Sequence, residues 1–348
     1  HVSSYLLNLK DLVFPESKAP KLETWGEWLA YAAQNPNVAD LRAGVEVLLT
    51  TQPRAVWTTE TMRAGHLHLL ELLTSDWFLA FPAAYTVVSA LATQIVMDVA
   101  FPEESQTHIE FYVAILTGMC QLARPNTTDT TLIIRLADAI LRGNPAQAMD
   151  VLSFLQEWFE RPIPLLAPLV LESFEVLAES GLEGWRLQPL FQKWLVALLD
   201  QPMAQTRTDL GLWLSFGPWM NSAPELLTKA EEILQRQAED ETDNPIARLP
   251  ARFLIVIFML RKSTADRVRL ALLDRNPELD VRICLEKAMN DQVASLARNA
   301  DMAVVVTTCI THAITYGIEP LLTNEPIYPQ SSGSTSILGK IEDASRAS

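Results

Sequence analysis

The stretch "LQPLFQKWLVALL" (187–199) shows the pattern that decides which fold the sequence predicts. Its apolar residues at positions i, i+3, i+4, i+7 and i+11 are Leu187, Leu190, Phe191, Trp194 and Leu198. That spacing places them on one face of an α-helix, because side chains three and four positions apart are neighbours on a helix. The stretch "PELLTKAEEILQRQ" (224–237) has the same pattern, with charged residues on its opposite face. We therefore expect a chain built mainly of amphipathic helices.

Asparagine–proline pairs mark where several of these helices are expected to begin. The pairs are Asn35-Pro36, Asn144-Pro145, Asn244-Pro245 and Asn276-Pro277. An asparagine side chain caps the first free amides of a helix, and a proline at the first helical position lacks the amide that needs a partner. Counting the stretches between such breaks predicts roughly fifteen helices of about 12–20 residues, joined by short loops.

A second start signal stands in front of residues 224–237. Ser222 and Glu225 have the spacing of a capping box, in which the serine oxygen accepts the glutamate amide and the glutamate side chain reaches back. The sequence therefore predicts a sharply defined helix start at this point.

Two of the expected junctions between helices have a similar sequence, an Asn-Pro turn followed by an aliphatic residue and an arginine. In "LALLDRNPELDVRICLEKAMND" (270–291) a helix ends, an Asn-Pro turn follows, and a Val-Arg pair opens the next expected helix. The stretch "AAQNPNVADLRAGVEVLL" (32–49) has a Leu-Arg pair at that place. These junctions resemble those of HEAT and armadillo-type helical repeats. The resemblance implies a ladder of stacked aspartate and arginine side chains, for which Asp280, Arg282 and Arg42 are the candidates.

We therefore expect an all-α fold, an irregular stack of antiparallel helical hairpins in a HEAT-like α-solenoid with an extended C-terminal tail. The expected parts are an N-terminal helical array (1–236), an acidic loop (237–245), C-terminal helical hairpins (246–316) and an extended tail or linker (317–348). Prolines and a Ser/Gly/Thr cluster predict the tail. The run "AVVVTTCIT" (303–311) stays open between helix and strand, because its β-branched residues favour strands.

Composition and charge disfavour several classes of function. The net charge of −15 counts against nucleic acid as the main ligand, because phosphate binding needs a surplus of lysine and arginine. The 12 glycines disfavour glycine-rich phosphate loops. The three cysteines, Cys120, Cys284 and Cys309, are too far apart for a disulfide framework, so we expect free thiols and a cytoplasmic location.

Long apolar stretches raise the possibility of a membrane span. Residues 77–97 are long enough, but Pro82 and a polar row at helical spacing (Thr86, Ser89, Thr93) favour a buried helix. Residues 302–318 are short for a span and hold four threonines and His312, so we expect them in the protein interior. The run "FLIVIFML" (253–260) has only eight residues, so we expect core rather than a span.

The glycine-rich tail and the acidic run do not fit a nucleotide or metal site. Five residues separate Gly333 from Gly339 where the phosphate loop has four, and Ile341 stands where its serine or threonine is needed. The acidic run "EDETDN" (239–244) lacks the central glycine and closing glutamate of a calcium loop. A solvated acidic segment is the simpler interpretation.

The histidines and cysteines do not form a ligand set in the sequence. His66 and His68 are two positions apart on an expected helix and point away from each other. Cys309 and His312 can share a helix face, but no third ligand follows nearby. We therefore predict no catalytic, cofactor or metal-binding residues and no cofactor.

Aromatic and apolar residues outside the clearest helices are the candidates for binding a partner. Trp213 and Trp219 lie beside the helix breaks of Gly217 and Pro218, and tryptophan is enriched at binding hot spots. Filling helix contacts is the alternative role for such tryptophans. The tail adds isolated apolar residues within polar sequence, namely Ile327, Tyr328, Ile337 and Leu338.

These features together predict a non-enzymatic scaffold or adaptor that binds a protein or peptide along a helical groove. The alternatives are a regulatory or sensor arm of a larger multidomain protein, and a helical enzyme with a site assembled over distance. We expect no nucleic-acid partner and no membrane span.

Overall fold

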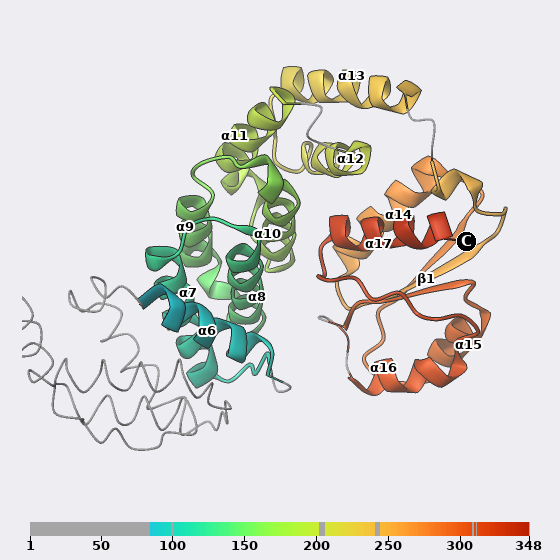
Figure 1. The fold of residues 1–348 in the computed structure, drawn as a ribbon, viewed down its shortest axis with the longest axis horizontal. Coiled ribbons are helices and arrows are strands. Elements are labelled where there is room, and N and C mark those ends of the chain that lie inside the picture. Colours follow the sequence, from blue (N-terminus) through green and yellow to red (C-terminus); the bar gives the residue numbers. More distant parts are fainter. Residues whose placement is uncertain are drawn as a thin grey trace, which may run out of the picture. The chain divides into compact units, whose positions relative to one another are not determined.

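The computed structural model describes residues 84–98, 101–201, 206–240, 244–307, 310 and 312–347, and Figure 1 shows its ribbon. This part of the chain is mostly helical, as the sequence predicts, and it also contains a three-stranded parallel sheet. The chain divides into two compact units, His1–Pro145 and Ala146–Ser348.

The elements fall in the following order along the chain. The α-helices are α6 (Ala84–Val96), α7 (Gln106–Leu122), α8 (Thr127–Gly143), α9 (Ala148–Trp158), α10 (Ala167–Glu179), α11 (Gln188–Leu199), α12 (Arg207–Phe216), α13 (Pro224–Asp240), α14 (Lys262–Arg275), α15 (Asp291–Asn299), α16 (His312–Ile318) and α17 (Ser334–Ala347). The strands are β1 (Leu254–Phe258), β2 (Asp280–Cys284) and β3 (Met302–Val305).

Helices α6, α7 and α8 of the first unit pack on one another around a buried carboxylate. Asp129 of α8 is 1% exposed and accepts a hydrogen bond from the Tyr85 hydroxyl at 2.8 Å and from Ser89 Oγ at 3.4 Å. Asn126 caps α8 by accepting the Asp129 amide at 3.0 Å. Ser89 belongs to the polar row expected on this helix, and its bond to Asp129 links α6 to α8.

The helical part of the second unit has an aromatic core. The predicted apolar face of residues 187–199 is confirmed as buried, and Phe191 and Trp194 on it have no exposed surface. The Phe191 ring lies 5.2 Å from that of Trp213 in α12 and 6.1 Å from that of Phe174 in α10. Trp194 donates its indole N–H to the Phe159 carbonyl at 3.0 Å, so burial leaves this polar group satisfied.

The parallel sheet lies at the C-terminal end of the second unit, with β1 between β2 and β3. All five residues of β1 are buried, because helices cover both faces of the sheet. Helices α15 and α16 pack against the face formed by Leu254, Val256 and Phe258. Helices α14 and α17 pack together on the other face (Figure 1).

The all-α prediction is wrong for this region. "FLIVIFML" is core, as expected, but it forms β1, and the junction expected to open a HEAT-like helix at Val281 forms β2. "AVVVTTCIT", which the sequence left open, contributes to β3. Short apolar runs do not distinguish a buried strand from a buried helix by periodicity alone, and here the β-branched residues decide in favour of strands.

The Asn-Pro pairs start a helix at only some of their positions. A 3-10 turn at Pro145–Gln147 leads into α9, and Asn244 accepts the Ala247 amide at 3.1 Å at the start of a 3-10 turn. Asn144 and Asn276 themselves end the preceding helices, α8 and α14. The buried Asn276 side chain bonds the carbonyls of Ile246 and Leu249, each at 3.1 Å, and the chain continues into β2. Asn35-Pro36 lies outside the described residues.

The predicted capping box is formed only in part. Helix α13 begins at Pro224, where the sequence predicts a helix start. The Ser222 hydroxyl oxygen, however, is buried and has no hydrogen-bond partner among the described residues. The predicted helix start is therefore confirmed, although no hydrogen bond to the Ser222 hydroxyl oxygen caps this helix.

The predicted division of the chain also differs from the structure in content. Residues 246–316 contain strands as well as helices, and residues 334–347 of the expected extended tail form α17. The acidic segment continues α13 as far as Asp240, and residues 241–243 lie outside the described ranges. The four boundaries themselves, and the stacking of helical hairpins into a solenoid, stay predictions. Of the described helices, none is long and apolar enough to cross a membrane.

Candidate functional site: the free edge of the sheet

The two edges of the sheet differ in whether the chain covers them. Beside β3, Ile327 donates its amide to the Ala303 carbonyl at 2.8 Å and accepts the Val305 amide at 2.8 Å. This bridge places Ile327 parallel to β3 and closes that edge at this point. An edge strand with free backbone groups is a place where another strand can add, so the edge of β2 becomes the candidate site.

Alternation along β2 shows which backbone groups are free. Asp280 donates its amide to the Phe253 carbonyl and Cys284 accepts the Met259 amide, each at 3.1 Å. In a parallel ladder every second residue bonds the same neighbour, so Arg282 also faces β1. The backbone groups of Val281 and Ile283 therefore point away from the sheet. In the described part of the chain, no residue bonds these outward groups.

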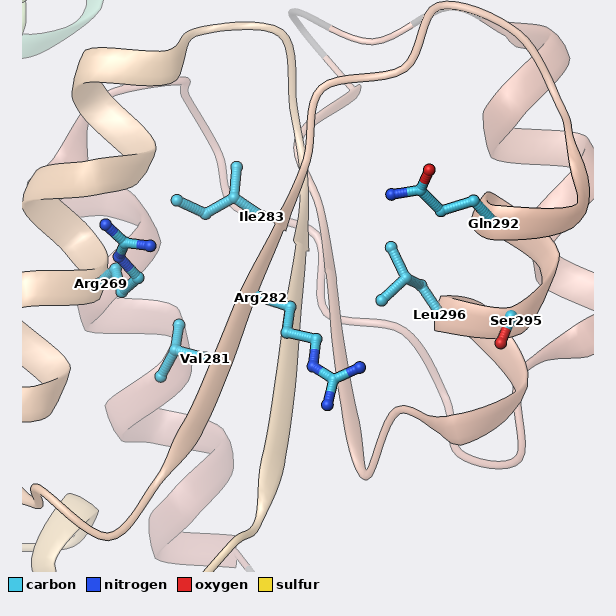
Figure 2. Close-up of a pocket in the computed structure, with 7 residues that line it drawn as sticks. All are labelled: Arg269, Val281, Arg282, Ile283, Gln292, Ser295 and Leu296. Carbon is cyan, nitrogen blue, oxygen red and sulfur yellow. The ribbon is translucent and has the colours of Figure 1, made fainter.

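A hollow of about 480 Å³ surrounds this edge. Figure 2 shows that Val281 and Ile283 project toward α14, whereas Arg282 projects toward α15. The complete lining is Arg269, Val281, Arg282, Ile283, Gln292, Ser295 and Leu296. An approaching strand would thus meet backbone groups along its centre, with Val281, Ile283 and Arg269 on one face and the α15 side chains and Arg282 on the other.

Both arginines of the hollow have carboxylate partners close in sequence. Arg282 donates to Asp280 from two nitrogens, at 2.7 and 3.2 Å, and these side chains are 55% and 40% exposed. The hydrogen bond to Asp280 raises the pKa of Arg282 above its ordinary value, so its positive charge is secure. Arg269 pairs with Asp266 at 3.0 Å on the surface of α14. Water and salt screen such exposed pairs, so either arginine can exchange its partner at small cost.

At the carboxyl end of the sheet, unlike at the edge of β2, the free backbone and hydroxyl groups have partners within the chain. Three glutamates of α10 accept hydrogen bonds there, at the starts of α14 and α17. The bonds are Ser331 Oγ to Glu172 (2.7 Å), the Ser334 amide to Glu175 (3.0 Å) and the Ser263 amide to Glu179 (3.2 Å). We call these contacts the α10 seam. Carboxylates suit helix N-termini, where free amides and the helix dipole favour negative charge.

Glu175 is the most deeply buried member of the α10 seam. It is 0% exposed and lies 3.2 Å from the Nε of Arg267, and Ser334 bonds it through both amide and hydroxyl. Burial raises the pKa of Glu175, while Arg267, Ser334 and Arg261 oppose that rise. The Arg267 guanidinium in turn lies 4.4 Å from the centre of the Phe216 ring.

Gly333 lets α10 approach the serine loop. A Cβ at this position would lie 2.9 Å from Cδ of Glu172 and 3.0 Å from its Cβ and Cγ. A second set of buried charges lies further along α17, where Glu342 accepts from Arg275 at 2.5 Å and from Thr208 at 2.6 Å. The amides at the starts of α14 and α17 thus already hold carboxylates, so the α10 seam offers no open anion site.

The predicted partner-binding residues do not come together. Trp213, Ile337 and Leu338 are buried, with exposures of 0%, 0% and 1%. Trp219 is 39% exposed and packs edge-on against Phe216.

The two remaining candidates lie near the closed edge of the sheet. Ile327 bonds β3, and Tyr328 beside it is 39% exposed. Burial, followed by a hydrogen bond to Glu319, raises the pKa of Tyr328 to about 12. A role of any of the six residues in partner binding stays a prediction.

The other residues singled out by the sequence are accounted for as follows. Asp280 and Arg282 pair with each other on β2 rather than in a ladder between repeats. Gly333 lies in the α10 seam and Gly339 inside α17. Arg42, His66, His68 and Cys309 are outside the described residues. Among the residues that the structure places, no three histidines, cysteines or acids lie close enough to hold a metal ion.

Sequence reasoning missed the free edge of β2 altogether. Its signal was present, because "DVRIC" (280–284) alternates polar Asp280 and Arg282 with apolar Val281 and Ile283. A period of two is typical of a strand with two different faces. The neighbouring Asn-Pro turn predicts a helix start instead, and that prediction conceals the alternation.

Comparison with known proteins corrects the predicted family. A protein family described as DpdD-like matches residues 5–340. The resemblance to HEAT and armadillo-type repeats is therefore wrong, since the two junctions that carried it cover a small share of the chain and one of them is a strand. No curated protein and no solved structure matches the chain.

Proposed function

The chain belongs to the DpdD-like family, and we propose that it is a protein-interaction module that accepts an extended segment of another polypeptide along β2. The single observation that carries this proposal is the free edge of β2, with the backbone groups of Val281 and Ile283 directed away from the sheet. An added strand gains its affinity from main-chain hydrogen bonds and its specificity from alternate side chains.

The hollow around the edge supports the same function. Residues of α14 and α15 flank the strand, so an added segment has side-chain contacts on both faces as well as the backbone ladder. Arg269 lies on the α14 side and Arg282 on the α15 side, where each can meet a carboxylate of the partner. This function is a form of the scaffold or adaptor that the sequence predicts, but the proposed binding surface is the edge of the sheet and not a helical groove.

A regulatory arm and a helical enzyme are the other functions that the sequence leaves open. The regulatory arm is compatible with a binding edge, because such an arm also needs a surface for its partner. The enzyme alternative requires convergent acids or bases in an accessible pocket. The buried carboxylates of the α10 seam instead bond helix N-termini and arginines, which supports a structural role for them.

Capture with a matched pair of variants tests the proposed function. Val281→Pro removes the outward amide, whereas Val281→Ala keeps this amide and shortens only the side chain. We expect the wild-type chain and V281A to retain the same polypeptide from a lysate of source cells, and V281P to lose it. Hydrogen exchange should then show protection of the Val281 and Ile283 amides in the complex. Equal capture by V281P would contradict the proposed site.

A further inference from the structure

The free edge of β2 is self-complementary about Val281. Asp280 and Arg282 flank Val281, and alternation directs both side chains to the α15 face of the sheet. When two antiparallel β2 strands are related by a two-fold axis through Val281, residue 280 of each strand stands opposite residue 282 of the other. Each Asp280 then faces an Arg282, and opposite charges directly across a strand pair stabilise it.

The same register uses the outward backbone groups. The two Val281 residues form a hydrogen-bonded pair in which each donates its amide and accepts through its carbonyl. Ile283 of one copy stands opposite Leu279 of the other. The Leu279 amide already bonds the Asn276 carbonyl at 3.3 Å, so this amide does not join the ladder. The paired valines meet on the α14 face, where β-branched neighbours pack well.

Local charge and apolar surface also favour a second copy. The chain carries −15 overall, but both arginines of the hollow are already paired with a carboxylate, Arg269 with Asp266 and Arg282 with Asp280. Distant acids contribute little, since the screening length is about 8 Å at physiological ionic strength. Val281 and Ile283, which line the hollow on its α14 side, supply apolar surface at the edge itself.

We propose that the edge of β2 binds β2 of a second copy of this chain in this antiparallel register. The two sheets join into one continuous sheet, and the interface is isologous because the same residues serve both copies. This inference rests on the proposed function, since it names the partner that the same edge accepts.

Charge exchange across the two-fold axis tests the register. Arg282→Asp places acids at both positions 280 and 282 of one chain, and Asp280→Arg places arginines at both. Each variant alone sets like charges opposite each other, whereas a mixture of the two pairs Asp with Arg at both positions. The double variant D280R/R282D also restores the pairing in a single chain. The molar mass of the 348-residue chain, measured by analytical ultracentrifugation from about 1 to about 100 μM, reports association.

We expect the wild-type chain to dimerise, each single variant to weaken the dimer at least about tenfold, and both the mixture and D280R/R282D to restore it. V281P should be monomeric over the same range. A wild-type chain that stays monomeric, a dimer that persists in V281P, or single variants that associate as the wild type does would each overturn the inference.

Failure of the inference is distinguishable from failure of the proposed function. A monomeric wild-type chain that captures a different polypeptide, with capture lost in V281P, overturns the second copy as occupant and leaves strand addition intact. A monomeric chain whose capture is the same in V281P overturns both.

Discussion

The two sides of α14 hold their charges in opposite ways. Toward α10, α12 and α17, the pairs Arg267–Glu175 and Arg275–Glu342 are largely buried, with side-chain exposures of 16% or less. Toward the edge of β2, Arg269 and Arg282 are exposed and pair with neighbours in sequence. A buried pair cannot be opened without leaving a charge away from water, whereas an exposed pair exchanges readily. The contrast supports a structural role for the buried pairs and is compatible with the binding role proposed for the free edge.

Removing the buried carboxylate of Glu175 should have the largest effect on the stability of the chain. We expect Glu175→Ala to lower the free energy of unfolding by about 3 kcal/mol, because Arg267 and the Ser334 amide lose their buried partner. Urea unfolding followed by circular dichroism measures this difference.

Glu179→Ala is the matched control on the same helix. Glu179 also accepts an amide at a helix start, but it is exposed, so its removal should cost about 1 kcal/mol or less. Equal effects of the two variants would show that burial of Glu175 has no special weight in the α10 seam.

Two glycines of the C-terminal segment should respond to alanine with opposite signs. Gly333→Ala places a Cβ about 3 Å from Glu172, and we expect a loss of about 1–3 kcal/mol from this overpacking. Gly339 lies inside α17 with nothing within 4 Å of an added Cβ, so Gly339→Ala should stabilise the chain by about 0.5–1 kcal/mol. Thermal unfolding of both variants measures the difference, and a destabilised G339A together with an unchanged G333A would contradict the close packing of α10.

The pH dependence of stability should report on Glu175. Burial raises its pKa in the folded chain, so between the unfolded and folded pKa values the folded chain binds more protons than the unfolded chain. The free energy of unfolding therefore falls as pH rises through this interval, and the stabilisation by this group is complete only below its unfolded pKa.

Glu175→Gln cannot titrate and isolates this contribution. We expect the unfolding free energy of the wild type, minus that of E175Q, to shrink as the pH rises above 4.5, the ordinary pKa of a glutamate. Asp209, whose pKa burial also raises, titrates in both proteins and cancels in this difference. A difference that stays constant, or that grows with pH, would show that burial does not dominate at Glu175.

The sequence predicts those features whose pattern is complete within one helix or strand, and it does not predict contacts between residues far apart in the chain. Helical periodicity identified the buried face around Trp194, because that pattern is complete within one element. Strand β1 was missed, since its five residues are buried on both faces and show no alternation. The α10 seam was out of reach for another reason. Glu175 and Ser334 are 159 positions apart, and only the folded chain shows that they meet.

The smallest effect on stability is expected at the free edge, and it tests whether that edge is open. The Val281 amide points outward, so Val281→Pro removes no bond of the sheet and should change the free energy of unfolding by less than about 1 kcal/mol. Arg282→Pro is the inward control: its amide faces β1, and its loss leaves a buried carbonyl of β1 without a partner, at about 1–3 kcal/mol. Urea unfolding at a concentration where the chain is monomeric separates this comparison from association. If V281P lowers the free energy of unfolding as much as R282P does, the Val281 amide has a partner within the chain. The edge of β2 is then not free, and the contrast between the two sides of α14 does not hold.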